Sequence, residues 1–180
     1  FKINYPKGLV EIHFKDNQLQ KQSQLEIMGD TIQIDQAREM ALLLFKENEI
    51  IENIFNILQN GVAVKTKVSF LGKNLNHLFK GKKFTLSGQI KNGIVNIPET
   101  NLTASDVDGS VTIKNGILNV NTDKGTIQGS KIKKSTLTVD LLNYVNFPFH
   151  GEFELDIDLS RIVQTLIYLL PDTALAKELS

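Results

Sequence analysis

The chain has 180 residues, enough for one domain with a sizeable core, and its 20 basic and 20 acidic side chains cancel to a net charge of zero. This balance offers no broad attraction to nucleic acid, so no nucleic-acid partner is expected. The chain has no cysteine, which excludes disulfides, thiolate nucleophiles and zinc–thiolate sites but leaves the cellular compartment open.

The first predicted element is a β-hairpin in the sequence LEIMGDTIQI. Glycine and aspartate tolerate the positive backbone angles of a tight two-residue turn, so we expect Gly29-Asp30 to form one. That register pairs Ile27 with Ile32 and Leu25 with Ile34, which puts all four apolar side chains on one face.

A long amphipathic helix is predicted next, over residues 36–59. Its apolar residues recur at spacings of three and four: Met40, Leu43, Leu44, Ile51, Ile54, Phe55 and Leu58. Asp35 is placed to cap the start and Gly61 to end the helix, with a bend near the sequence KENE. A short helical turn is expected within residues 73–80.

Two near copies of one octapeptide follow, IKNGIVNI at 90–97 and IKNGILNV at 113–120. Asn-Gly between alternating apolar runs is the strongest short signal for a β-hairpin, so each copy is predicted to turn at its Asn-Gly pair. With turns at Asn92-Gly93 and Asn115-Gly116, the predicted opposite pairs are Ile90 with Val95, Gly88 with Ile97, Ile113 with Leu118, and Val111 with Val120. One face of each hairpin would be apolar and the other polar.

Two further strands and a helix are predicted toward the end of the chain. STLTVDLL and EFELDIDLS alternate apolar and polar residues, and their apolar positions are Leu137, Val139, Leu141, Phe153, Leu155, Ile157 and Leu159. A helix is expected over 160–170, capped by Ser160 and stopped by Pro171, with the start of another after it. The pattern predicts one domain over residues 1–180, a strand-dominated α+β fold in which a long antiparallel β-meander carries two or three amphipathic helices.

The polar residues do not form a catalytic constellation. His13, His77 and His150 are scattered without a metal-ligand spacing, so no metal site, cofactor or enzymatic activity is expected. The sequence 106–109, Asp-Val-Asp-Gly, lacks the closing glutamate of a calcium loop and is interpreted as a turn.

Charged residues on the predicted strands are interpreted as solvent-facing. Asp156 and Asp158 share one strand face with two glutamates, so a solvated face is favoured over acid–base chemistry. Two lysine clusters are interpreted as charged protection of edge strands: Lys80, Lys82 and Lys83, and Lys131, Lys133 and Lys134.

The predicted helices either cover the apolar face of the sheet or leave it open. A 24-residue helix is about 36 Å long, and strands lie about 4.8 Å apart, so it could cross roughly seven strands. It would cover a band only about 10 Å wide, which is narrower than a strand of five or six residues is long. A closed core and an open trough are both compatible with the sequence.

Two segments, LSGQIKNGIVNIPETNLTASDVDGSVTIKNGILNVNTDKGTIQGSKIK and FPFHGEFELDIDLSRIVQTL, together resemble the AsmA-like proteins of bacteria with two membranes. The shared cadence is a set of short strands around Asn-Gly turns, then a long alternating strand that leads into a helix. It covers residues 86–170 and contains no catalytic signature. The resemblance implies a single curved, groove-like sheet with an apolar concave face, lined by Ile90, Val95, Ile97, Val111, Ile113, Leu118, Val120, Leu137, Val139, Phe153, Leu155, Ile157 and Leu159.

The function implied by the resemblance is phospholipid transport between the inner and outer membranes. The expected partner is a phospholipid or another acyl-chain lipid, shielded from water along the apolar face. The chain would then be a fragment of a longer periplasmic protein, held at the inner membrane by an anchor outside the fragment. The alternative is a structural or interaction module of the envelope with a closed core, which aids outer-membrane protein assembly and binds no lipid.

Overall fold

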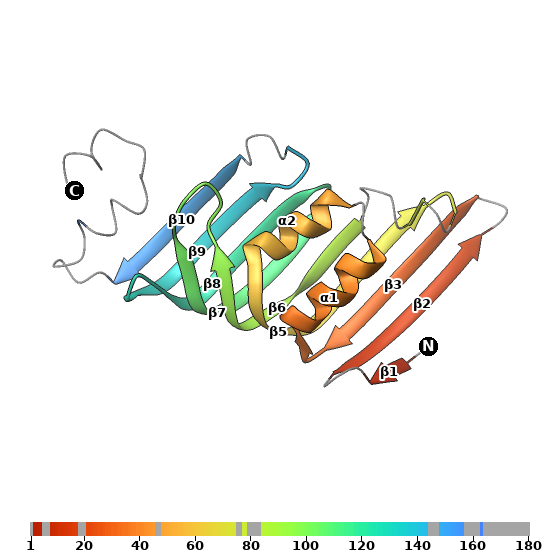
Figure 1. Cartoon of the computed structure of the whole chain (residues 1–180), viewed down its shortest axis with the longest axis horizontal. Helices are drawn as coiled ribbons and strands as arrows, with labels where there is room; N and C mark the ends of the chain where they lie inside the picture. The colour runs from red at the N-terminus through yellow and green to blue at the C-terminus, as the bar shows by residue number, and fades with distance from the viewer. Residues whose placement is uncertain are drawn as a thin grey trace.

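Figure 1 shows the chain in a computed structural model, which describes residues 2–4, 8–17, 21–45, 48–74, 77–78, 84–143, 148–156 and 163. The strands are β1 (Lys2–Asn4), β2 (Leu9–Asn17), β3 (Gln22–Asp30), β4 (Ile32–Gln33), β5 (Leu58–Gly72), β6 (Phe84–Asn96), β7 (Thr103–Lys114), β8 (Ile117–Ile127), β9 (Ser130–Asp140) and β10 (Phe149–Asp156). The helices are α1 (Ile34–Leu44) and α2 (Glu49–Ile57).

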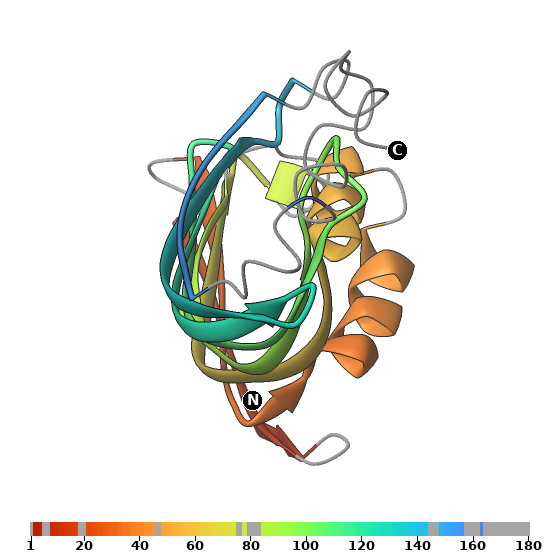
Figure 2. The ribbon, with the colours of Figure 1, turned by 90° about the vertical axis from the view of Figure 1, so that its left-hand side faces the viewer.

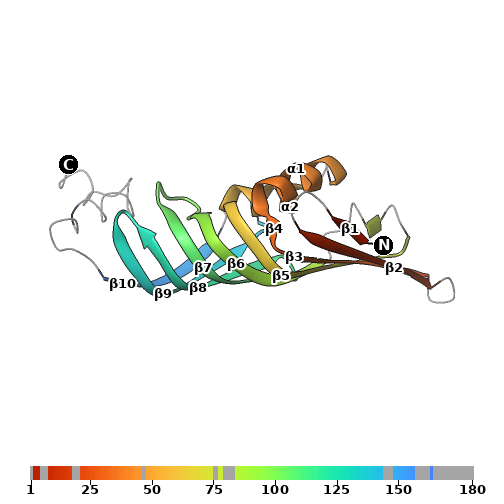
Figure 3. The ribbon, with the colours of Figure 1, turned by 90° about the horizontal axis from the view of Figure 1, so that it is seen from below.

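The strands form one antiparallel sheet in the order β1-β2-β3-β5-β6-β7-β8-β9-β10, and the two-residue β4 pairs with β5. Strands that follow one another in the chain are neighbours in the sheet, except that β4, α1 and α2 lie between β3 and β5. The prediction of a strand-dominated α+β meander with amphipathic helices is confirmed at this level. Figure 2, an end-on view, and Figure 3 both place the two helices on the same side of the sheet.

The predicted helix over 36–59 is wrong as one continuous element, because the chain forms two shorter helices around the sequence KENE. Asn48 accepts a hydrogen bond from the Ile50 amide at 3.2 Å and so caps α2, while α1 begins without a side-chain cap at Gln33. Asp35 lies inside α1, and residues from Leu58 onward belong to strand β5. The break falls where the bend was predicted, and because the apolar period of three and four persists across it, the pattern indicates a bend rather than two separate helices.

Only one of the three predicted hairpins forms. At Asn115-Gly116 both residues have positive φ, 53° and 78°, and Ile113 faces Leu118 as predicted. Gly29-Asp30 instead ends β3, which pairs with β2 and β5, and Leu25 lies opposite Phe14 and Phe70.

Asn92-Gly93 lies within β6 as a bulge, so the predicted pairing of Ile90 with Val95 is wrong. The turn after β6 falls six residues later, where the Ile97 amide donates to the Leu102 carbonyl at 3.0 Å around Pro98. A bulge satisfies the same positive φ of 49° at Asn92 that a hairpin turn would, so the local sequence does not distinguish the two.

A row of bulges crosses the middle of the sheet. It comprises Gly61 on β5, Asn92-Gly93 on β6, and Asp106 on β7, and the register of each strand pair shifts there. A Cβ placed on Gly61 would lie 2.8 Å from the Cα of Gly93, so the neighbouring backbones approach too closely for any other residue. Bulges bend strands, and Figure 2 shows that these strands curve strongly. The prediction of a turn at 106–109 is therefore wrong, because these residues lie inside β7.

One face of the sheet is apolar through every strand from β2 to β10. The paired registers place the side chains of one row opposite one another: Ile12, Ile27, Val68, Leu86, Ile113, Leu118, Val139 and Phe149. Most of this face belongs to a single cluster of buried apolar residues that also contains Ile50, Ile51 and Ile54 of α2. The predicted continuity of the apolar face therefore extends beyond the repeated octapeptides into the first half of the chain.

Candidate functional site

The residues predicted to line an apolar groove lie on one face, and most of them are buried. Ile90, Val95, Ile97, Val111, Ile113, Leu118, Val120, Leu137 and Val139 are each 4% exposed or less. Phe153 and Leu155 on β10 are half-buried against the same cluster, and Ile157 and Leu159 lie outside the described residues. Over β6 to β9 this face is therefore in contact with protein rather than with solvent.

The same face is more open toward the beginning of the chain. Phe14 on β2 is 49% exposed, and Ile12, Leu25 and Ile27 are only half-buried. On the helix above, Met40 is 43% exposed and lines a cavity beneath the helices. Exposed apolar side chains therefore lie around β2 and α1, and Phe149 on β10 is exposed at the other end of the same face.

The cavity lies between the helices and the sheet and has a volume of about 230 Å³. Helix α1 contributes Ala37, Met40 and Ala41, α2 contributes Ile51, Ile54 and Phe55, and the sheet contributes residues that include Val10, Ile27, Val68, Leu86, Ile90 and Val111. Because Met40 belongs both to the lining and to the exposed surface, it marks a mouth of the cavity.

Three stacked phenyl rings form one wall of the cavity and join the end of α1 to the sheet. The ring centroids of Phe45 and Phe70 are 5.0 Å apart, and those of Phe70 and Phe84 are 5.5 Å apart. All three side chains are buried. The stack therefore ties the end of α1 to β5 and β6 beside the cavity.

The cavity offers almost no polar partner to a bound molecule. Among the described residues that line it, no side chain is charged. Gln36 Oε1 and Thr66 Oγ1 belong to lining residues, but both oxygens are themselves buried and have no hydrogen-bond partner. Apolar contact is therefore the dominant interaction that this space can make.

The charged side chains with shifted pKa values lie on the strands, outside the cavity lining. Asp108 accepts a hydrogen bond from the Asn92 amide at 2.9 Å, and the ammonium groups of Lys124 and Lys91 lie 3.0 and 3.3 Å from it. The backbone hydrogen bond from Asn92, followed by the two lysines, holds the pKa of Asp108 below its ordinary value against the opposing effect of desolvation. Asp108 thus ties the bulge of β6 to β7 and β8.

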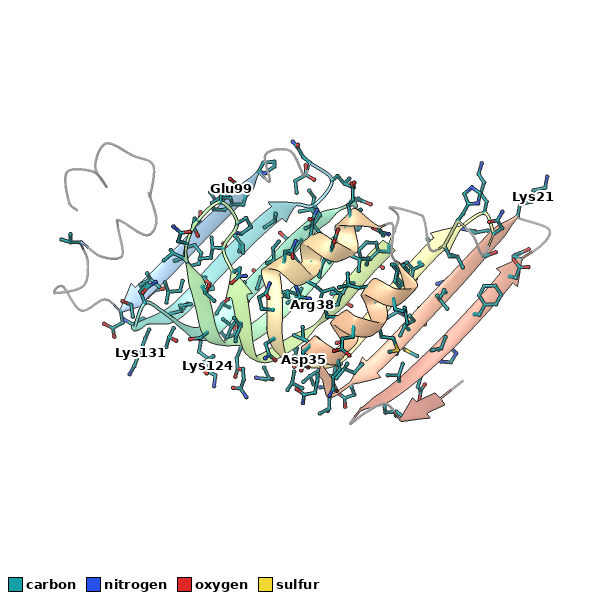
Figure 4. All side chains as sticks on the ribbon, viewed as in Figure 1. Lys21, Asp35, Arg38, Glu99, Lys124 and Lys131 are labelled. Atoms are coloured by element: carbon teal, nitrogen blue, oxygen red, sulfur yellow. The ribbon has the colours of Figure 1, made fainter. Side chains whose placement is uncertain are left out.

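A hydrogen bond from Lys67, with the ammonium 2.7 Å from the carboxylate, likewise lowers the pKa of Glu26 on the open surface of β3. Figure 4 shows Lys124 and Lys131 projecting from the rim of the sheet, away from the two helices. These pairs link neighbouring strands, and they do not gather into a site.

The other polar candidates remain apart in the structure. His13, His77 and His150 are exposed on separate segments, and no group of three or more metal-ligating side chains occurs among the described residues. Asp156 is exposed, as predicted for a solvated strand face, and Asp158 lies outside the described residues.

The edge-strand interpretation of Lys131, Lys133 and Lys134 is wrong, because β9 lies between β8 and β10. Their side chains are exposed, and β10 supplies acidic neighbours: Lys133 lies 4.0 Å from Asp156. The cluster Lys80, Lys82 and Lys83 lies outside the described residues. The helical turn predicted within 73–80 is present at His77 and Leu78, and of the helix predicted over 160–170 only Val163 is described, as helical.

Sequence reasoning missed the cavity because its walls come from distant parts of the chain. Thr66, Gly88 and Ala41 line it together, yet nothing in the order of residues indicates that they meet. The available signal was the apolar stripe of the helices, which the sequence interpretation treated only as a possible cover for the sheet.

No family model matches the chain, and neither a curated protein nor a solved structure matches it significantly. No helix in the described part of the chain combines the length and the apolar character that a membrane span requires. The site must therefore be interpreted from its own geometry.

Proposed function

We propose that this chain is a non-enzymatic segment of an AsmA-like envelope protein that shields lipid acyl chains from water and so supports phospholipid transport between the two bacterial membranes. The observation that carries the proposal is the apolar cavity beneath α1 and α2, which reaches the surface at Met40. The apolar face continues from it onto β2 and β3, where Phe14 is exposed. Together these surfaces resemble a sheltered, groove-like path for hydrocarbon.

Burial in the cavity favours the binding of an acyl chain. A group the size of a water molecule takes roughly 30 Å³, so a cavity of about 230 Å³ holds about eight methylenes. At about 0.8 kcal/mol for each buried methylene, the gross gain is about 6 kcal/mol. The remaining methylenes of a membrane lipid would lie along the half-buried residues of β2 and β3, with the headgroup in water.

The direct test is photocrosslinking in cells that make the protein. A photoreactive residue at Met40 is expected to capture phospholipid, detected by mass spectrometry of the purified adduct. Leu71 is the matched control: it is 45% exposed, similar to Met40, but the alternation of β5 places it on the opposite face from Phe70. The proposal fails if Met40 captures no more lipid than Leu71 and no lipid copurifies with the protein.

A second candidate function is a structural or interaction module of the envelope with a closed core. It is favoured by the burial of the predicted lining over β6 to β9, where Leu118 and Val139 are fully buried. This candidate predicts protein crosslinks rather than lipid crosslinks at Met40 and Phe14. The two candidates therefore give opposite products in the same experiment.

A further inference from the structure

The cavity beneath the helices has the capacity of one short alkyl segment. Its lining runs from Val10 on β2 to Val111 on β7, which crosses four inter-strand spacings, or about 19 Å at about 4.8 Å each. This span includes the lining residues themselves, so the space that they enclose is shorter. A volume of about 230 Å³ corresponds to about eight groups of roughly 30 Å³, which is one alkyl segment of about eight carbons.

The lining also excludes the polar end of a lipid. A phosphate or a carboxylate brought inside would need a cation or accessible donors, and the described lining residues include no charged side chain. The polar lining residues are Gln36, Thr66 and Gln89, and none of them supplies the charge that would balance an ionised headgroup. A headgroup consequently remains outside the mouth at Met40, where it is solvated.

We propose that the cavity is a pocket for the terminus of one alkyl chain, which admits about eight carbons and does not distinguish headgroups. This inference rests on the proposed function and deepens it, because it assigns the binding site and the class of ligand. Binding then depends on chain length only until the pocket is full. Each carbon up to that point increases affinity by up to about fourfold, and further carbons add much less because they stay outside.

The test is a titration of the 180-residue chain with three series of single-chain amphiphiles below their micelle concentrations. The series are n-alkyl sulfates, n-alkyl trimethylammonium salts and n-alkyl glucosides, each with six, eight, ten and twelve carbons. We expect the affinity measured by calorimetry to rise and then level near eight carbons in all three series. A steady rise to twelve carbons, or an affinity that depends strongly on headgroup charge, would overturn the inference.

Variants that fill the pocket test whether the chain-length plateau arises there. Ala37 and Ala41 line it from α1, so Ala41→Leu, or Ala37→Leu if the first does not fold, is expected to move the plateau to shorter chains by two or three carbons. Thr112→Leu is the matched control, because Thr112 is exposed on β7 and is not part of the lining. An unchanged plateau in a folded Ala41→Leu or Ala37→Leu variant would also overturn the inference.

The result of the amphiphile titration can be told apart from the result of the crosslinking test of the proposed function. A chain-length plateau without lipid crosslinking at Met40 would support the pocket and remove phospholipid transport. Lipid crosslinking at Met40 with a steady rise to twelve carbons would support an open path for hydrocarbon and remove the chain-terminus pocket.

Discussion

Asp108 is expected to stabilise the curved form of the sheet by fixing the bulge at Asn92. Its carboxylate accepts the Asn92 amide at 2.9 Å and lies 3.0 and 3.3 Å from Lys124 and Lys91, and its side chain is only 11% exposed. A hydrogen bond to a charged group contributes about 1.5–3 kcal/mol. Both lysines are more than half exposed, so each ion pair adds less than about 1 kcal/mol.

Two substitutions at this position separate the charge from the acceptor. Asp108→Asn keeps an oxygen for the Asn92 amide but loses the charge, and we expect a loss of about 1.5 kcal/mol in the free energy of unfolding. Asp108→Ala also leaves that amide without its acceptor, and we expect the free energy of unfolding to decrease by about 3 kcal/mol. For a chain of this size these losses correspond to decreases in melting temperature of about 3–6 °C and about 6–12 °C.

The assay is thermal unfolding followed by circular dichroism, with Asp106→Asn as the control. Asp106 is exposed and has a φ of 52°, which asparagine tolerates, so this variant should melt within about 1 °C of the wild type. If Asp108→Asn and Asp106→Asn have the same melting temperature, the charge of Asp108 contributes nothing to stability and the reasoning is refuted.

The stabilisation that Asp108 provides should depend on pH. Because the pKa of Asp108 is lowered by folding, its contribution is present above the ordinary value of 3.8 and is lost as the pH falls through the lower pKa of the folded state. The difference in stability between wild type and Asp108→Asn should therefore be constant near neutral pH and shrink below about pH 4. A difference that grows on acidification would contradict the assigned direction.

Two further predictions concern packing. Phe70→Ala removes the middle ring of the aromatic stack and should lower the free energy of unfolding by about 3–5 kcal/mol, whereas Phe70→Leu should lower it by less than about 1.5 kcal/mol. Similar urea midpoints for the two variants would show that the stack is unimportant. A Cβ on Gly109 would overlap the backbone carbonyl of Asn121, so Gly109→Ala should cost about 3 kcal/mol or more. At Gly125 the nearest atoms to a new Cβ are a methyl of Ile132 at 3.1 Å and the Ser105 carbonyl oxygen at 3.2 Å, so Gly125→Ala should cost less than Gly109→Ala. Equal losses in urea unfolding would refute this distinction.

The burial pattern bears on how a lipid would enter the molecule. The predicted lining is closed by protein over β6 to β9, where Ile113 and Val120 are 1% and 2% exposed, while the exposed residues nearest the cavity, Met40 and Phe14, lie on α1 and β2. Under the proposed function, hydrocarbon contacts begin near α1 and β2, and the repeated octapeptides serve mainly as core. The cavity residues are then the positions to test first, and Ile90 and Val111 are the two predicted lining residues among them.

The identical tetrapeptide IKNG illustrates how far local sequence determines the backbone. Asn92 and Asn115 adopt nearly the same φ, 49° and 53°, as the preference of asparagine for this region predicts. One forms a hairpin turn and the other a bulge, because Asn92 is held between β5 and β7 and donates its amide to Asp108. The backbone angle of the asparagine was predictable from the sequence, but whether it forms a turn or a bulge was not.

The sequence by itself determined the class of the fold and the direction of its apolar side chains. Alternation with a period of two is a property of each strand alone, so Leu118 could be placed on the same face of its strand as Val120, and Leu137 on the same face as Val139, before the neighbouring strands were known. Tertiary structure decided which residues on that face are covered, where the long helical pattern breaks, and that a cavity remains beneath α1 and α2. These features depend on contacts between segments far apart in the chain, such as Phe45 on Phe70 and Asp108 on Asn92, whose geometry no local pattern encodes.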